Sequence, residues 1–369
     1  MEVIQEAISR REAELYADQK AALDAVHAFI RRNKLMVHGG TAVSAMLFDE
    51  DRRDLCGGGI DYDVLVRTLT AKGVSNLAYE LQAELSELGF RSNFKGAVHD
   101  GTVKLFAVPR SKKATEQKSY REVVDLTALA PAEYDALLAL SKKESKLVTD
   151  RLLVYVPVVY VKMGAHLEFS RPQAHVARWL KVFPRVSALY KRFPSVDVHR
   201  ASRHGLPAKP REGGSTAVAP FPGKAARESG WVVVGHEALK RILRLPHASL
   251  PPPPHAVEFV IRRGGAGGVP GLQPGVSEGG LVLPPHGTAA DGGVFYLSED
   301  CDAYNEAADG TLVGSPDLVL RFMYARYIMF PRERAYLEVA IDALTAQMEA
   351  ALRRNSGLSK RFVVECMRE

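Results

Sequence analysis

The 369-residue sequence predicts an α/β fold of the mixed α+β type, with helices flanking a mixed sheet and a second α/β domain after it. Three observations support this prediction. Short apolar strands alternate with amphipathic helices in the first half of the chain. A glycine turn joins a strand directly to a helix in "LMVHGGTAVSAML" (Leu35–Leu47). This segment also aligns without gaps on "WVVVGHEALKRIL" (Trp231–Leu243), which indicates a repeated unit.

Hydrophobic periodicity assigns the elements of the first half in order. Apolar residues at helical spacing predict a helix over residues 2–33. The strands predicted after it are Leu35–Val37, Ile60–Val66, Thr102–Val108 and Glu122–Leu129. The helices predicted after it begin near Thr41 and cover Asn76–Phe90, Ala132–Leu140, Val158–Phe169 and Gln173–Arg192.

The composition changes near Arg200. Residues 200–230 are rich in glycine, proline and basic residues, which is typical of a linker or a loop, and residues 250–293 resemble them. Apolar stripes predict two helices between residues 315 and 354. We therefore expect one domain over 1–199, a linker or loop over 200–230 and a C-terminal domain over 231–369. The second copy of the repeat lacks the Gly-Gly-Thr turn, so this domain is either a degenerate copy of the first or similar to it by chance.

The composition is that of a globular protein, with 46% hydrophobic and 25% charged residues. A formal net charge of +6 fits a polyanionic partner such as a nucleic acid. Cys56, Cys301 and Cys366 lie far apart, which argues against a zinc site or a disulfide framework. The charged N-terminal segment and the absence of a long apolar run lead us to expect an intracellular protein without a signal peptide or membrane span.

Acidic residues on two predicted strands indicate a metal site. Asp61 and Asp63 are two residues apart, so a strand places both carboxylates on one face. Asp125 is the acid inside a later apolar strand, where an aspartate is uncommon without a partner. Mg²⁺ prefers hard oxygen ligands, and three such carboxylates can hold two ions.

The Gly-Gly-Thr turn indicates a phosphate site. A turn that enters a helix presents free backbone N–H groups and the positive end of the helix dipole. Gly39 and Gly40 allow close approach because they lack a Cβ, and Thr41 can cap the helix and donate its hydroxyl to a phosphate oxygen. The order of turn, Asp-x-Asp strand and third acid predicts that phosphate and metal ions meet at one end of one sheet, which favours nucleotidyl transfer.

This order resembles the DNA polymerase β-like nucleotidyltransferase superfamily. Longer segments are similar to the poly(A) polymerase catalytic subunits of large nucleocytoplasmic DNA viruses, of the giant-virus type. They are "AVHDGTVKLFAV" before "VVDLTAL", the long "VYVKMGAHLEFSRPQAHVARWLKVFPRVSALYKRFP" (Val159–Pro194) and the tail "KRFVVECMRE". The resemblance covers residues 35–195 well and is thin beyond 200.

The resemblance implies a nucleotidyltransferase-type sheet and a template-independent polymerase. Its substrates would be ATP and an RNA 3′ end, with two Mg²⁺ or Mn²⁺ ions. By position, the metal-binding acids are Asp61, Asp63 and Asp125, and the nucleotide-binding turn is formed by Gly39, Gly40 and Thr41. Relatives of this type also lead us to expect a homodimer, a separate stimulatory subunit as a further partner, and a location in the host cytoplasm or the virion.

Basic residues after the first domain's strands are candidates for phosphate contacts. Arg178, Lys181 and Arg185 share one face of a predicted helix, where they either contact RNA phosphates or form a solvated charged face. Arg171, before Pro172, either joins that surface or ties a turn to a neighbouring acid. Lys162 matches lysines of the superfamily that reach the triphosphate, so it is a candidate for nucleotide binding.

Two other functions remain open at this stage. The chain could be another nucleotidyltransferase of the superfamily that modifies tRNA ends, a small molecule or a protein. It could also be a non-catalytic RNA-binding subunit, although the presence of all three acids argues against this alternative.

Overall fold

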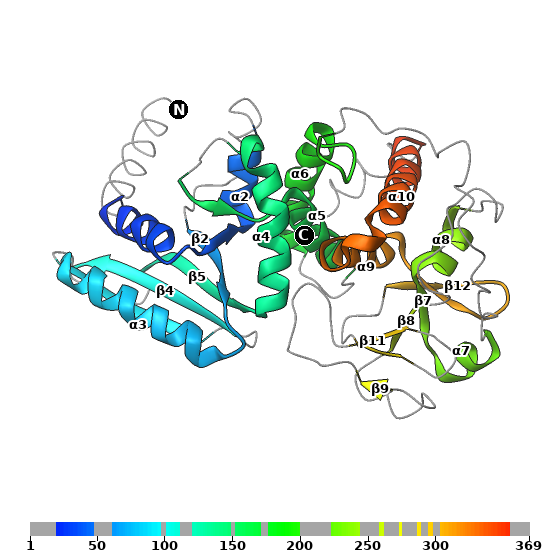
Figure 1. The fold of residues 1–369 in the computed structure, drawn as a ribbon, viewed down its shortest axis with the longest axis horizontal. Coiled ribbons are helices and arrows are strands. Elements are labelled where there is room, and N and C mark those ends of the chain that lie inside the picture. The colour runs from blue at the N-terminus through cyan, green and yellow to red at the C-terminus, as the bar shows by residue number, and fades with distance from the viewer. Residues whose placement is uncertain are drawn as a thin grey trace, which may run out of the picture. The chain divides into compact units, whose positions relative to one another are not determined.

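The computed structural model of the chain describes a defined set of residues, which form two compact units, Met1–Pro157 and Val158–Glu369, each with its own sheet (Figure 1). The described residues are 20–47, 61–96, 101–110, 120–148, 152–170, 176–199, 223–243, 258–261, 273–274, 286–288, 294–297 and 303–354. The helices α5 (Val158–Phe169) and α6 (Val176–Arg192), which we expected within a first domain over 1–199, group with the second unit.

The sheet of the first unit has six strands in the order β3-β4-β5-β2-β1-β6. Its strands are β1 (Met36–His38), β2 (Tyr62–Arg67), β3 (Phe90–Gly96), β4 (Thr102–Pro109), β5 (Arg121–Leu129) and β6 (Val154–Tyr155). β2 runs parallel to β5 and β1 runs parallel to β6, while the other neighbouring pairs are antiparallel. The mixed sheet predicted from the sequence is confirmed.

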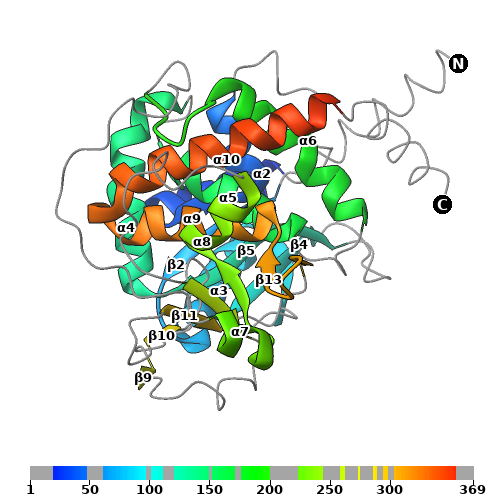
Figure 2. The same ribbon diagram turned by 90° about the vertical axis from the view of Figure 1, so that its right-hand side faces the viewer.

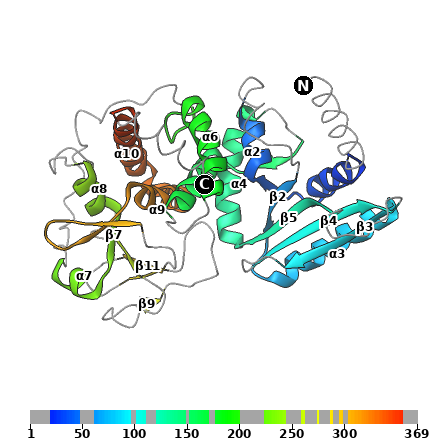
Figure 3. The same ribbon diagram turned by 180° about the vertical axis from the view of Figure 1, so that it is seen from behind.

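Helices pack on this sheet, and a capping residue marks where one of them begins. They are residues 20–32, α2 (Gly39–Met46), α3 (Ala71–Glu87) and α4 (Pro131–Glu144), which leads into the short 3₁₀ helix η3 (Ser145–Leu147). α3 packs against β3, β4 and β5 and lies along the sheet (Figure 3). It begins five residues earlier than its predicted start at Asn76, because the side chain of Thr70 caps it by accepting a hydrogen bond from the Gly73 N–H.

The sheet of the second unit has seven strands in the order β12-β13-β7-β8-β11-β10-β9. Its strands are β7 (Val232–Val234), β8 (Glu258–Ile261), β9 (Gln273–Pro274), β10 (His286–Thr288), β11 (Val294–Leu297), β12 (Tyr304–Glu306) and β13 (Leu312–Gly314). We expected a loop over 250–293, but β8, β9 and β10 lie within it. Their four residues or fewer are too short to show a period of two among prolines and glycines.

The two sheets have the same topology. In the second sheet, five strands follow one another in the order β7, β8, β11, β10 and β9. Each neighbouring pair in this series runs in the same relative direction as the pair at the same place in the series β1, β2, β5, β4 and β3. β13 runs parallel to β7, as β6 does to β1. The repeat between Leu35–Leu47 and Trp231–Leu243 therefore extends to six strands of the second sheet, while the edge strand β12 has no counterpart among the described strands of the first.

Helices of the second unit pack against one another and on its sheet (Figure 2). They are α5 and α6, α7 (Gly223–Ser229), α8 (Gly235–Leu243), α9 (Pro316–Met329), the 3₁₀ helix η6 (Pro331–Glu333) and α10 (Arg334–Arg354). α9 contacts α5, α8 and α10, and its residues are almost all buried. Within the described residues, every helix is too short or too polar to cross a membrane.

Candidate active site

A row of four polar residues crosses the sheet of the first unit. His38 at the end of β1 pairs in register with Asp63 on β2, and Asp63 pairs with Asp125 on β5. Asp125 pairs on its other side with Lys104 on β4. Residues that face each other across neighbouring strands point to the same face of a sheet, so four adjacent strands present these side chains side by side.

Gly39 makes this arrangement sterically possible. β1 ends at His38 and α2 begins at the next residue, so the chain turns without a loop, and Gly39 adopts a φ of +65°. A Cβ on Gly39 would lie 1.9 Å from the Asp63 Oδ2 atom. Glycine is therefore required twice, for the left-handed backbone and for the space that the Asp63 carboxylate fills.

Replacing Gly39 by alanine is expected to displace Asp63 and to lower the nucleotide transfer that the sequence predicts. The matched control is Gly230→Ala, because Gly230 has a φ of +64° but nothing within 4 Å of the position of a Cβ. Both variants pay for the strained backbone, about 1 kcal/mol or more. Only Gly39→Ala also creates a clash, so it should lose more stability in urea denaturation and more activity. Equal losses in the two variants would contradict the role assigned to Gly39.

Thr41 and Asp61 connect the helix to the acidic strand. The Thr41 hydroxyl donates a hydrogen bond of 3.0 Å to the backbone carbonyl of Asp61. Thr41 lies inside α2, and the N-cap position belongs to His38, whose side chain makes no capping hydrogen bond. The prediction that Thr41 caps the helix is therefore wrong. Its hydroxyl instead fixes the residue at which the chain enters β2, which positions Asp61 beside Asp63.

Asp125 is buried and carries a basic partner. Its side chain is 13% exposed, and its Oδ2 atom accepts a hydrogen bond of 2.5 Å from the Lys104 ammonium. The same ammonium donates to Glu122 at 2.6 Å. Burial, followed by the nearby Glu122 carboxyl, raises the pKa of Asp125, and the hydrogen bond from Lys104 opposes this rise.

The acids of the row fit divalent metal ions in their chemistry. The Asp125 Oδ1 atom is buried and accepts no hydrogen bond from any residue that the structure describes. Such an acceptor is costly unless a cation or donor meets it. Asp63 lies next to it in register, and Asp61 is half-buried two residues before Asp63. Within the described residues, no three carboxylate, thiol or imidazole groups lie together as a set that could hold a metal ion, so Asp61, Asp63 and Asp125 do not form such a set in this structure.

The second unit has lost the polar row. The residues at the positions of His38, Asp63, Asp125 and Lys104 are found from the corresponding strand pairs. They are Val234, Glu258, Val294 and Thr288, respectively. The glycine turn is retained, because Gly235 has a φ of +70° and a Cβ there would lie 1.8 Å from the Glu258 Oε2 atom. The backbone geometry has thus been conserved between the two copies while the acids have not.

The remaining acid of the second unit is neutralised internally. Glu258 is buried, and its Oε1 atom lies 3.1 Å from the Arg326 guanidinium and accepts a hydrogen bond of 2.8 Å from Tyr296. Arg326 also pairs with Glu333 at 2.5 Å. Burial lowers the pKa of Arg326, but the carboxylates outweigh burial and raise it above its ordinary value. A buried guanidinium therefore occupies the place of an external cation beside Glu258.

The structure does not support nucleotide binding by Lys162. Lys162 is 1% exposed, and its ammonium donates hydrogen bonds to the backbone carbonyls of Phe193 and Ser195 at 2.6 and 3.4 Å. It also lies 4.3 Å from the centre of the Tyr190 ring. These contacts satisfy a buried ammonium and join α5 to the end of α6. The corrected role of Lys162 is therefore structural.

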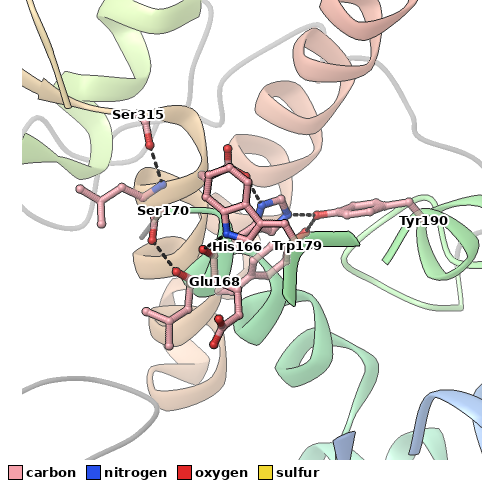
Figure 4. A network of polar contacts seen from close by, with 10 residues as sticks. His166, Glu168, Ser170, Trp179, Tyr190 and Ser315 are labelled. Atoms are coloured by element: carbon pink, nitrogen blue, oxygen red, sulfur yellow. Dashed lines mark hydrogen bonds and ion pairs between the residues drawn. The ribbon is translucent and has the colours of Figure 1, made fainter. Parts of the chain in front are cut away.

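A polar network around His166 joins three helices (Figure 4). His166 on α5 pairs through Nδ1 with Asp317 on α9 and through Nε2 with the Tyr190 hydroxyl on α6, each at 2.7 Å. The Trp179 indole N–H donates to the Glu168 carbonyl at 2.9 Å. These contacts join α5, α6 and α9, and they give Glu168 and Trp179, from the part of the chain that was distinctive in sequence, a structural role.

The basic residues of α6 differ in their surroundings. Arg178 forms an ion pair of 2.8 Å with Glu168. Lys181 is exposed and Arg185 is half-buried on the same helix. Arg171 lies outside the described residues. RNA contact by these four residues therefore stays a prediction, and Arg178 already has a partner within the protein.

Lys104 and Glu122 are the residues of this site that sequence reasoning missed. Both lie in segments assigned as strands, and neither belongs to a spacing motif. The signal that could have found them is the buried Asp125, since a buried aspartate needs a partner and neighbouring strands are where partners lie. Register across β4 and β5 cannot be read from one sequence, so the pair appears only in the fold.

The sheet order, the glycine turn and the acidic row define a nucleotidyltransferase-type fold. The chain is similar to the crystal structure of the Megavirus polyadenylate synthase, with a TM-score of 0.71 and 16% sequence identity, over 96% of this chain and 74% of that chain. No protein-family model and no curated protein sequence matches this chain. The chain thus has the fold of a viral poly(A) polymerase, which confirms the resemblance drawn from its sequence.

Proposed function

We propose that this chain is a template-independent poly(A) polymerase that transfers AMP from ATP to an RNA 3′ end. The observation that carries the proposal is the placement of Asp63 and Asp125 on neighbouring parallel strands, beside a helix that begins at Gly39. In the reaction, the RNA 3′ oxygen bonds to the α-phosphorus of ATP while the bond to pyrophosphate breaks.

The three acids would hold the divalent ions. Asp61, Asp63 and Asp125 supply carboxylate oxygens, which are the ligands that Mg²⁺ prefers. The Asp125 Oδ1 atom accepts no hydrogen bond from the described residues. When bound, the ions neutralise charge that develops on the phosphate and on the attacking and leaving oxygens. Asp125, which comes from a different strand than the other two acids, would serve the side of the attacking 3′ oxygen, as the third acid does in the superfamily that the chain resembles.

The start of α2 would bind the triphosphate. The first backbone N–H groups of a helix have no partner within the helix, and the helix dipole adds positive potential there. Gly40 is half-buried at this position and has no side chain to oppose phosphate oxygens, and no acidic residue occupies the first turn of α2. The Asp61–Thr41 hydrogen bond keeps this turn next to the metal-binding acids.

The reaction can be tested with purified protein, labelled ATP, Mg²⁺ and an oligo(A) primer. A poly(A) polymerase produces a ladder of extended products that grows with time. Addition of a single nucleotide would indicate an enzyme that modifies tRNA ends. Labelling of a protein or small molecule in place of RNA would indicate a nucleotidyltransferase with that kind of substrate. RNA binding without any transfer would contradict an enzymatic role.

RNA binding is expected to depend on salt and on the basic face of α6. Each phosphate contact to a single strand contributes about 0.7 to the slope of log affinity against log salt. Changing Lys181 and Arg185 to glutamate should therefore flatten the slope by roughly one to two units. Fluorescence anisotropy across a salt series measures this change, with ATP binding as the readout that should move less. The control is the pair Lys142→Glu and Lys143→Glu on α4. An unchanged slope in the α6 variant would make its basic residues a solvated helix face.

A further inference from the structure

We propose that Lys104 is a positioning residue for the metal-binding carboxylate of Asp125. The proposal rests on the metal-dependent transfer described above and adds a residue that acts through Asp125 and not on the substrate. Lys104 would hold the Oδ2 atom of Asp125, so that the Oδ1 atom remains available to a divalent ion.

The contacts of Lys104 place it behind the acid. Its ammonium lies 2.5 Å from Asp125 Oδ2 and 2.6 Å from the Glu122 carboxylate. Asp125 lies between two neighbours in register, with Lys104 on the β4 side and Asp63 on the β2 side. The lysine therefore approaches Asp125 from β4, while Asp63 lies on the other side, on β2. It binds the Oδ2 atom of Asp125, and the Oδ1 atom is buried without a hydrogen bond from the described residues.

Glu122 fixes the position of the ammonium. A lysine side chain has many rotamers, and a single partner would leave Lys104 free to turn away. With Glu122 as a second acceptor, the ammonium bridges two carboxylates three residues apart on the same strand. The bridge also offsets the repulsion between these carboxylates, which would otherwise disfavour the charged form of the buried Asp125.

The second unit provides an internal comparison for this role. Val294 stands at the position of Asp125, and Thr288 pairs with it where Lys104 pairs with Asp125. The copy without the acid is thus also the copy without the lysine. The acid and the lysine are thus present together in the first unit and absent together from the second, which is what a role of Lys104 through Asp125 requires.

Mn²⁺ binding to the complete protein without ATP tests the proposal. Lys104→Met removes the ammonium but keeps the length of the side chain, and Lys104→Arg keeps a donor. Loss of a hydrogen-bonding partner behind a ligand typically weakens metal binding by about 10- to 100-fold. We expect Lys104→Met to show this loss in electron paramagnetic resonance titrations, and Lys104→Arg to recover most of it. The Asp125→Ala variant gives the affinity expected when the ligand itself is absent.

Lys95→Met is the matched control. Lys95 lies on β3 directly opposite Lys104 and is exposed, and its ammonium is 5.8 Å from the centre of the Phe106 ring. Lys95→Met changes the net charge by the same amount as Lys104→Met. Lys95 itself contacts neither Asp125 nor Glu122 in the described structure. Mn²⁺ affinity in Lys95→Met should therefore equal that of the parent protein, which separates positioning from long-range charge.

The outcomes test the positioning role of Lys104 separately from the poly(A) polymerase function. Unchanged or tighter Mn²⁺ binding in Lys104→Met would overturn the proposal, because the lysine would then be neutral to the ion or would repel it. Weaker binding in Lys104→Met with no recovery in Lys104→Arg would also overturn it. If the protein fails to extend RNA but Lys104→Met still weakens Mn²⁺ binding and Lys104→Arg restores it, the positioning role stands and the poly(A) polymerase function fails. If RNA is extended and Mn²⁺ binding is the same in all lysine variants, the function stands and the positioning role fails.

Discussion

Replacing Asp63 by alanine should reduce nucleotide addition by about 10³-fold or more, equivalent to roughly 4 kcal/mol of transition-state stabilisation. Asp63 is central in the polar row, with His38 on one side and Asp125 on the other. Its carboxylate is the group against which Gly39 packs, so no other acid can move into its place. Asp61→Ala and Asp125→Ala should cause comparable losses, because each acid contributes ligands to the same ions.

The fold should survive these changes. Removal of Asp61 or Asp63 relieves repulsion among neighbouring acids, so the free energy of unfolding in the absence of metal is expected to stay the same or rise slightly. Asp125→Ala also removes the partner of the Lys104 ammonium, so this variant is expected to be less stable than the other two. Circular dichroism with urea denaturation, beside a primer-extension assay with Mg²⁺, measures both effects. Asp135→Asn is the control, because Asp135 is an exposed acid of the same unit that pairs with Arg67 at the surface. Full activity in any of the three alanine variants would overturn the metal assignment.

Replacing Arg326 by methionine should destabilise the second unit by about 3–5 kcal/mol. Arg326 is 3% exposed and is the cation between the buried Glu258 and Glu333, and it also donates to the Tyr296 hydroxyl. Its loss leaves two carboxylates without their cation, in surroundings where burial has already raised the pKa of Tyr296 well above its ordinary value. The loss would appear in urea denaturation followed by the fluorescence of Trp231, which packs on Phe259 and Phe295 in the same sheet.

A double variant separates the charge effect from lost packing. Changing Glu258 to glutamine together with Arg326→Met removes a buried charge, so it should be more stable than Arg326→Met alone. Arg241→Met is the matched control, since Arg241 pairs with Glu237 and Asp309 at a partly exposed site and its loss should cost about 1 kcal/mol or less. A double variant no more stable than Arg326→Met would show that the methylene packing of the arginine, and not its charge, supports this unit.

The two units share the geometry of the turn from strand to helix but differ in the surroundings of the acid beside it. Both turn from strand to helix at a glycine with positive φ, and in both an acid fills the space in front of that glycine. In the first unit the acid is half-buried and has a second acid as its neighbour in register, where we propose that divalent ions bind. In the second unit the acid meets an internal arginine, and a valine replaces the second acid. The same backbone geometry therefore occurs around a buried acid that pairs with an arginine of the protein itself.

The amino-acid sequence by itself determined the local elements and the identity of the acids. The strand–glycine–helix turn, the Asp-x-Asp spacing and the buried Asp125 depend on residues near one another in the chain, where periodicity and side-chain chemistry are readable. The repeat between Leu35–Leu47 and Trp231–Leu243 was visible for the same reason. The resemblance to viral poly(A) polymerases followed from longer segments, above all Val159–Pro194, and agrees with the fold.

Tertiary structure alone decided which residues meet. Lys104 reaches Asp125, and Arg326 reaches Glu258, through strand register and helix packing that bring together residues 21 and 68 positions apart, and no local pattern encodes such pairs. The same reason explains the errors at Thr41 and Lys162, whose polar groups find backbone carbonyls of distant residues. A buried donor bonds whatever acceptor the packed chain places beside it, because leaving it unpaired costs more than any local preference gains.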